Sequence, residues 1–156
     1  MRAIATVAAL VLLLGALPAG PALAAGSGRE APVPPQPAAV PSAEQEYNRG
    51  LTAKNAKNWQ AAAASFQKAV GIKPAFPEAW NELGYALRNQ GRYPESLQAY
   101  DEALKLRPNF PEALEYLGEA YVKLGRMDDA RKILDRLKPL DAGRAAELSE
   151  AIEKGK

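Results

Sequence analysis

Residues 77–108 read PEAWNELGYALRNQGRYPESLQAYDEALKLRP and contain the signals of a helix, a turn and a second helix. Pro77 and Glu78 favour a helix start, because the missing proline N–H costs nothing there and a carboxylate stabilises the positive end of the helix dipole. The next apolar or small positions follow the i, i+3, i+4, i+7 spacing of one helix face: Trp80, Leu83, Gly84 and Leu87. Gly91 then ends this predicted helix.

The second predicted helix begins near Pro94 and ends before Pro108. Its apolar stripe is formed by Leu97, Tyr100 and Leu104. Ser96 and Ala103 are small enough to let a neighbouring helix approach closely. The stretch therefore predicts a helix–turn–helix unit.

Similar residues recur along the chain at a fixed interval of 34 residues. Small residues recur at Gly50, Gly84 and Gly118, and large apolar residues recur at Phe66, Tyr100 and Leu134. Such a period indicates one supersecondary unit stacked on copies of itself. We expect three repeats, at about residues 43–76, 77–110 and 111–142.

In this pattern the chain resembles the tetratricopeptide repeat family. The second unit carries the pattern at Trp80, Leu83, Gly84, Leu87, Ser96, Tyr100, Ala103 and Pro108. The first unit matches it at Gly50, Ala53, Ala62, Phe66, Ala69 and Pro74. Departures fall in the outer repeats, where Lys57 stands at the position of the turn glycine. The resemblance implies an all-α, right-handed α–α superhelix.

Residues 142–154 predict one more helix, since Ala145, Leu148, Ala151 and Ile152 share one face. We expect this helix to cap the exposed side of the third repeat. The predicted domain is 43–156.

Residues 1–25 have the layout of a secretory signal peptide: Arg2, an apolar run from Ile4 to Leu17, and the small-residue ending Ala22–Ala24. The alternative is an uncleaved membrane anchor, although the run is shorter than the roughly 20 residues that span a bilayer. We expect export across the inner membrane to the periplasm, with cleavage after Ala24 or Ala25.

Residues 26–42 are expected to be a disordered, proline-rich linker. Five of the thirteen prolines lie within 29–42, and proline disfavours helix and central strand alike. An alternative is that this stretch is itself a ligand for a proline-reading domain.

The composition argues against catalysis and cofactors. The chain has no cysteine and no histidine, which removes thiol chemistry and the usual neutral-pH base. Its formal charge is only +2, with both signs interspersed, which argues against a nucleic-acid partner. We expect a protein that is not an enzyme, with no cofactor and no metal site.

One carboxylate cluster, Glu112, Glu115 and Glu119, lies on one face of a predicted helix. Three interpretations are open: a solvated face with an ordinary Glu119–Lys123 pair, a site for a basic partner, or a cation site.

The family resemblance implies that a partner binds the inward face formed by the first helices of the repeats. The corresponding positions are Tyr47, Leu51, Lys54, Asn81, Tyr85, Arg88, Glu115, Glu119 and Val122. We expect these side chains to be free of the repeat core. Relatives that hold a terminal carboxylate use Lys, Asn and Arg at set positions of this face, which here are Tyr47, Leu51, Glu82, Glu112 and Tyr116.

The sequence thus predicts an exported adaptor or scaffold that binds a protein or peptide. A self-associating structural protein of the cell envelope is the alternative, so a homo-oligomer stays open.

Overall fold

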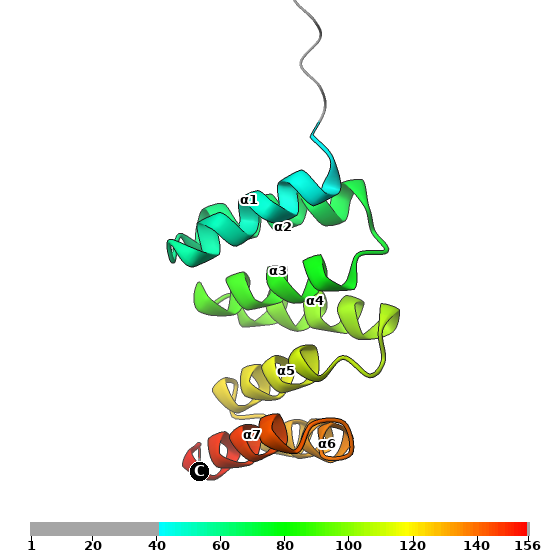
Figure 1. The fold of residues 1–156 in the computed structure, drawn as a ribbon. Helices are drawn as coiled ribbons and strands as arrows, with labels where there is room; N and C mark the ends of the chain where they lie inside the picture. The colour runs from blue at the N-terminus through cyan, green and yellow to red at the C-terminus, as the bar shows by residue number, and fades with distance from the viewer. Residues whose placement is uncertain (1–40, 156) are drawn as a thin grey trace, which may run out of the picture. The chain divides into compact units, whose positions relative to one another are not determined.

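The computed structural model describes residues 41–155, and this part of the chain is entirely helical, without a strand. The elements are α1 (Ala43–Asn55), α2 (Trp59–Ile72), α3 (Pro77–Asn89), α4 (Tyr93–Leu106), α5 (Pro111–Lys123), α6 (Met127–Leu137) and α7 (Ala142–Lys154). Successive helices pair as antiparallel layers that stack on one another (Figure 1). The predicted all-α helical-repeat fold is confirmed.

Local sequence signals fix the helix starts. Ser42 accepts a hydrogen bond from the Gln45 backbone while the Gln45 side chain accepts one from the Ser42 backbone, which forms a capping box before α1. Asn58 and Asp141 cap α2 and α7 through their side chains. These caps satisfy backbone N–H groups that have no partner inside the helix.

Glycine sets how closely the helices of the first two repeats approach. A methyl group added at Gly84 would lie 2.6 Å from the Tyr100 ring, and Gly50 meets Phe66 in the same way. Gly118 instead meets the side chain of Leu148 from α7. The third repeat is therefore closed by the last helix.

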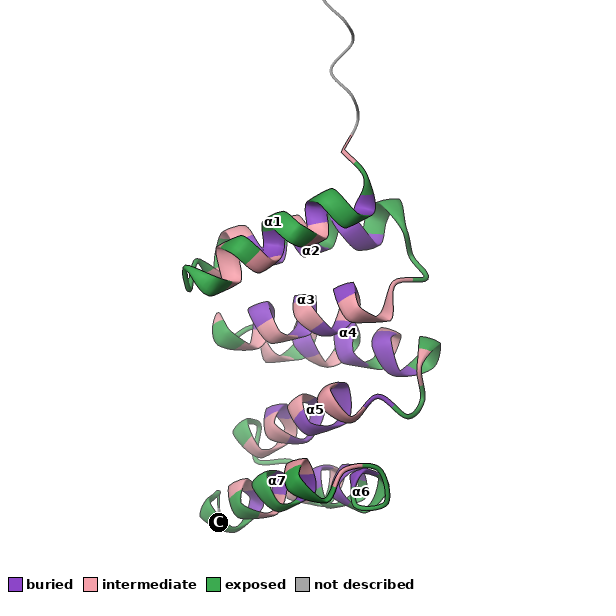
Figure 2. Cartoon of the chain, viewed as in Figure 1, coloured by how far each residue is buried: buried purple, intermediate pink, exposed green. Residues whose placement is uncertain are grey.

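The core is continuous along the stack and lies between the layers (Figure 2). One buried cluster centres on Phe66 and Leu83, the other on Tyr100, Leu114 and Leu148. Trp80 packs against both clusters and joins them.

The turns inside the repeats use a left-handed residue. Gly91 and Gly125 have φ angles of 74° and 70°, and Lys57 takes the same conformation with φ 55°. Side chains with a Cβ are strained in this region, so Lys57 is an unfavourable residue for its turn.

The predicted signal peptide and most of the predicted linker, through residue 40, lie outside the described residues. Within residues 41–155 no helix is both long enough and apolar enough to cross a bilayer.

Candidate functional site: the inward face of the first helices

The inward face is the surface on which the first helices α1, α3 and α5, together with α7, meet across the repeat boundaries. Charged side chains bridge each boundary. Lys54 of α1 donates to Glu82 of α3 with an N–O distance of 2.6 Å, and Arg88 of α3 pairs with Glu119 of α5. Ion pairs therefore link neighbouring helices along the length of the face.

Arg144 of α7 closes this series at the last boundary. It pairs with Glu115, whose side chain is 5% exposed, and with Glu112 at 3.1 Å. Burial outweighs the hydrogen bond and charge of Arg144, so the pKa of Glu115 is raised.

Aromatic rings occupy the centre of the inward face. The Tyr85 ring lies 5.0 Å from the Tyr116 ring and 5.8 Å from the Trp59 ring, measured between centroids. The Lys54 ammonium lies 4.8 Å from the Tyr85 centroid. The Arg88 guanidinium contacts both tyrosines, at 5.4 Å and 5.2 Å from their centroids. Because each ring touches its neighbours, this aromatic surface is held in place before any partner arrives.

Tyr47 of α1 belongs to a second aromatic group, with Phe66 and Phe76. Its ring lies 5.6 Å from Phe66 and 4.9 Å from Phe76. Burial raises the pKa of the Tyr47 and Tyr116 hydroxyls, with nearby carboxylates adding to the shift. Both hydroxyls therefore stay protonated at neutral pH and can donate hydrogen bonds.

Asn81 is a buried polar residue of this face with one atom that is unpartnered within residues 41–155. The residue is 4% exposed, and its Oδ1 atom has no hydrogen-bond partner among the described residues. A buried acceptor without a partner costs free energy, and this atom has under 1 Å² of accessible surface, so a bound segment does not reach it in this conformation.

The expectation that the predicted site residues are free of the repeat core is wrong for five of the nine. Asn81 and Glu115 are buried, and Tyr47, Leu51 and Val122 pack against the core. The side chains engaged in ion pairs between helices are Lys54, Arg88, Glu115 and Glu119. Tyr85 is partly buried, belongs to neither core cluster and makes no ion pair with a described residue.

The carboxylate cluster on α5 has its basic partner within the chain. Glu112 and Glu115 meet Arg144, and Glu119 meets Arg88 rather than Lys123. The sequence places these three carboxylates on one face of α5, but their basic partners lie on two different helices, Arg144 on α7 and Arg88 on α3.

Three residues that contact the predicted site residues were absent from the predicted site: Trp59, Glu82 and Tyr116. The contact of Tyr116 with Arg88 and Tyr85 depends on how α5 is placed against α3. The available signal was its position, since Tyr116 and Glu82 occupy places where carboxylate-binding relatives carry polar ligands.

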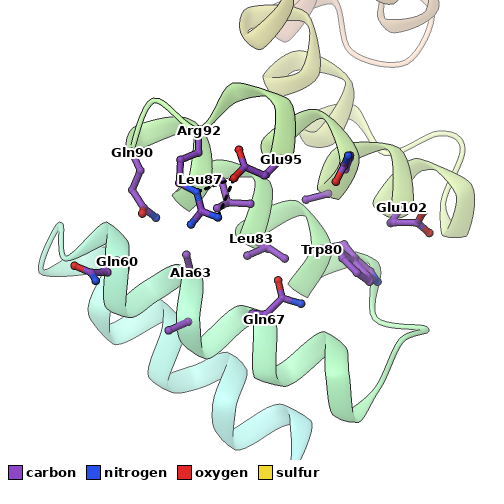
Figure 3. Close-up of a pocket in the computed structure, with 13 residues that line it drawn as sticks. Gln60, Ala63, Gln67, Trp80, Leu83, Leu87, Gln90, Arg92, Glu95 and Glu102 are labelled. Carbon is purple, nitrogen blue, oxygen red and sulfur yellow. Dashed lines mark hydrogen bonds and ion pairs between the residues drawn. The ribbon is translucent and has the colours of Figure 1, made fainter.

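The opposite side of the domain carries a cleft that the sequence did not predict. It has a volume of about 690 Å³ and lies between α2 and α4, with Leu83 and Leu87 of α3 at its base (Figure 3). Ala63 and Ala64 form part of the α2 wall. The equivalent of Ala63 in the next repeat is Leu97, which packs against the core, so alanine leaves this cleft open.

Comparison with known protein families identifies repeats in the same part of the chain. Residues 47–76 match the family described as tetratricopeptide repeat, and residues 84–125 match the family described as TPR repeat. The chain belongs to the tetratricopeptide repeat family. No curated protein sequence matches this tetratricopeptide repeat protein.

Solved tetratricopeptide repeat structures have the same fold. The TPR2B domain of yeast Sti1, in a complex with an Hsp70 peptide, is 20% identical with a TM-score of 0.68, covering 72% of this chain and 94% of that one. PcrH, in a complex with the chaperone-binding region of PopD, is 24% identical with a TM-score of 0.67, covering 72% and 89%. The first TPR of Spaghetti, bound to the HSP90 peptide SRMEEVD, is 16% identical with a TM-score of 0.69, covering 72% and 91%. At these identities the likeness establishes the fold alone.

Proposed function

We propose that this protein is a non-enzymatic adaptor that binds an extended segment of a partner protein on its inward face. The observation that carries the proposal is the pair of partly exposed tyrosines Tyr85 of α3 and Tyr116 of α5, whose ring centroids lie 5.0 Å apart and which Arg88 contacts together.

The fixed aromatic surface supports the same function. Tyr85 and Tyr116 are held at 5.0 Å by their neighbours, so a ligand that packs on them orders few additional side chains. A preorganised surface binds at lower entropic cost than a mobile one.

Recognition of an acidic chain terminus is not part of this proposal. Such a carboxylate needs cationic ligands, yet the corresponding residues include Glu82, Glu112 and Tyr116. Although two of the similar structures are complexes with Hsp70 or HSP90 peptides, we propose that this chain binds an internal segment instead.

We further propose that the protein acts outside the cytoplasm, in the periplasm. The support is the sequence of residues 1–25, with its apolar run and small-residue ending. Cell fractionation followed by N-terminal sequencing tests this directly. A mature chain that begins at Ala25 or Gly26 is expected, whereas an intact Met1 in the membrane fraction would establish the anchored alternative.

The binding function is tested by crosslinked capture from the protein's own envelope extract. The parent chain is compared with Tyr85→Ala, and Tyr121→Ala serves as the matched control. Tyr121 is a half-buried tyrosine of α5 that contacts Arg126 of the following turn, away from the aromatic surface. Helical circular dichroism must be the same for all three proteins.

A partner captured by the parent and by Tyr121→Ala, but lost with Tyr85→Ala, is the expected result. Equal capture by all three would place binding elsewhere, with the α2–α4 cleft as the next surface to test. Recovery of this chain alone would favour self-association.

A further inference from the structure

A cavity of about 330 Å³ lies at one end of the inward face, beside the last turns of α3, α5 and α7. Each of these three turns contributes one cation to the lining: Arg88, Lys123 and Lys154. The one acidic residue of the lining is Glu119, so three cations against one carboxylate leave a formal charge of +2. We call this space the cationic cavity.

The larger cleft between α2 and α4 has the opposite balance, with one cation and two carboxylates in its lining. A cation in the last turn of a helix also stabilises the helix dipole. That effect does not require three cations from three helices to line one space. The shared lining therefore indicates a site for a negatively charged group.

Arg88 is the least exposed cation of the cationic cavity, with a side chain that is 16% exposed. Its guanidinium is held in place by the rings of Tyr85 and Tyr116. Its Nη1 donates to Glu119, which is the one hydrogen bond that this guanidinium forms among the described residues. A guanidinium has five N–H donors in a fixed fork that matches a carboxylate, so Arg88 retains donors for a ligand.

The two lysines are available to the same ligand. Lys123 is exposed and has no ion-pair partner within residues 41–155. Lys154 pairs with Glu150, but the two side chains are 73% and 63% exposed, and such a pair contributes little to stability. Lys154 can therefore exchange Glu150 for a carboxylate in the cavity at small cost.

We infer that the cationic cavity binds the side-chain carboxylate of a glutamate or aspartate within the partner segment. The inference rests on the proposed function, since it assigns one recognition element to the segment bound on the inward face. Arg88 contacts both Tyr85 and Tyr116, so the cavity adjoins the aromatic surface. A segment that packs on these tyrosines can place an acidic side chain in the cavity.

The site differs from the one that holds a terminal carboxylate in relatives. The positions corresponding to that site lie outside the lining of the cationic cavity. Glu119 also forms part of the wall, and its charge repels a doubly charged phosphate more strongly than a singly charged carboxylate. The cavity is therefore assigned to a carboxylate side chain.

The experiment is a titration of the isotope-labelled full-length protein, followed by two-dimensional amide NMR. The probe is the blocked tripeptide acetyl-Ala-Glu-Ala-amide. Three matched peptides carry glutamine, lysine or phosphoserine in place of the glutamate. A fourth, acetyl-Ala-Gln-Ala with a free acid, supplies only a terminal carboxylate. Each titration is repeated at low and high sodium chloride concentration.

We expect the glutamate peptide to shift the amide signals of Val122, Lys123 and Ala151. It should bind at least about fivefold more tightly than each of the four matched peptides, with an affinity that falls as salt is added. Lys123→Glu should weaken its binding at least about fivefold. Lys68→Glu makes the same change in net charge at an exposed residue of α2 outside the cavity, and should alter binding by less than about twofold.

Equal binding of the glutamine peptide, or shifts confined to residues far from the cationic cavity, would overturn the inference. Tighter binding of the free-acid or phosphoserine peptide would overturn the assignment to a carboxylate side chain. An equal loss with Lys68→Glu would show attraction to the net charge of the protein instead of binding in the cavity. If the glutamate peptide fails to bind while extract capture still depends on Tyr85, the acidic class is wrong and the proposed adaptor function stands.

Discussion

Leu148 of α7 lies against the backbone of Gly118, where a methyl group on the glycine would be 2.5 Å from the leucine. In the first two repeats the matching contact is made inside the repeat, by Phe66 and Tyr100. Leu134 occupies that position in the third repeat and is smaller than either ring. The smaller side chain lets the last helix move in and complete the core.

This contact predicts that Leu148→Ala destabilises the domain by about 2–5 kcal/mol, the usual cost of a cavity at a fully buried leucine. Urea unfolding followed by circular dichroism measures the change. Leu140→Ala is the control, because Leu140 is 38% exposed and its loss should cost under about 0.5 kcal/mol. Similar midpoints for the two variants would show that α7 does not close the core.

At Gly84 we expect close packing to outweigh helix propensity, so that substitution by alanine lowers stability. Alanine is a better helix former by about 1 kcal/mol, yet at this position its methyl group would collide with the Tyr100 ring at 2.6 Å. Gly84→Ala should therefore lower the free energy of unfolding by about 1–3 kcal/mol.

Gly71 supplies the matched control within α2. A Cβ there meets no heavy atom within 4 Å, so Gly71→Ala should raise the free energy of unfolding by up to about 1 kcal/mol. Chemical denaturation should show changes in the free energy of unfolding of opposite sign for Gly84→Ala and Gly71→Ala. A stabilising Gly84→Ala would mean that the helices of the second repeat can separate freely.

Lys57 predicts a stabilising substitution. Its φ of 55° is strained for a residue with a Cβ, and the equivalent turn residues are Gly91 and Gly125. Lys57→Gly should gain about 1 kcal/mol from relieved strain, partly offset by the greater entropy of the unfolded chain. Lys68→Gly, in the exposed middle of α2, should lose about 1 kcal/mol. Thermal unfolding measures the stability of both variants. A lower stability of both would contradict the strain at Lys57.

Arg144 and Glu115 predict a pH-dependent change in stability. Burial raises the pKa of Glu115 above the ordinary value of 4.5, so the folded state holds this proton more tightly than the unfolded state. The stabilisation linked to this proton is present below pH 4.5 and is lost as the pH rises through the folded pKa. Removing Arg144 leaves the ionised form without its cation and enlarges this loss.

Arg144→Met should therefore be nearly neutral at about pH 4 and destabilising by about 1–3 kcal/mol at pH 7. Urea titrations at the two pH values measure the difference. Lys132→Met breaks an exposed pair with Asp129 and should change stability by under about 1 kcal/mol at pH 7. An Arg144→Met penalty that does not depend on pH would contradict the role given to Glu115.

The fold could be predicted from the sequence because each 34-residue repeat specifies one pair of helices. Gly84 and Tyr100, separated by 16 residues, recur as Gly50 and Phe66, and this spacing encodes a contact within one repeat. Contacts inside a repeat depend only on two helices and a short turn, so local patterns determine them.

Contacts between repeats could not be predicted from the sequence, because they depend on the rotation from one layer of helices to the next. Lys54 and Glu82 are 28 residues apart, whereas Arg88 and Glu119 are 31 apart, so the two ion pairs share no common spacing. The contact of Arg144 with α5 could not be predicted for a further reason. Helix α6 has 11 residues where α4 has 14, so α7 begins early and brings this arginine to α5.

Site-specific photo-crosslinking in the protein's own cells tests whether a partner contacts the inward face. A photoreactive phenylalanine derivative is placed at Tyr85, at Gln98 in the outward cleft, and at exposed Asp135 of α6. If the partner binds the inward face, position 85 gives a discrete adduct and positions 98 and 135 give none. An adduct from position 98 with none from position 85 would contradict binding to this face.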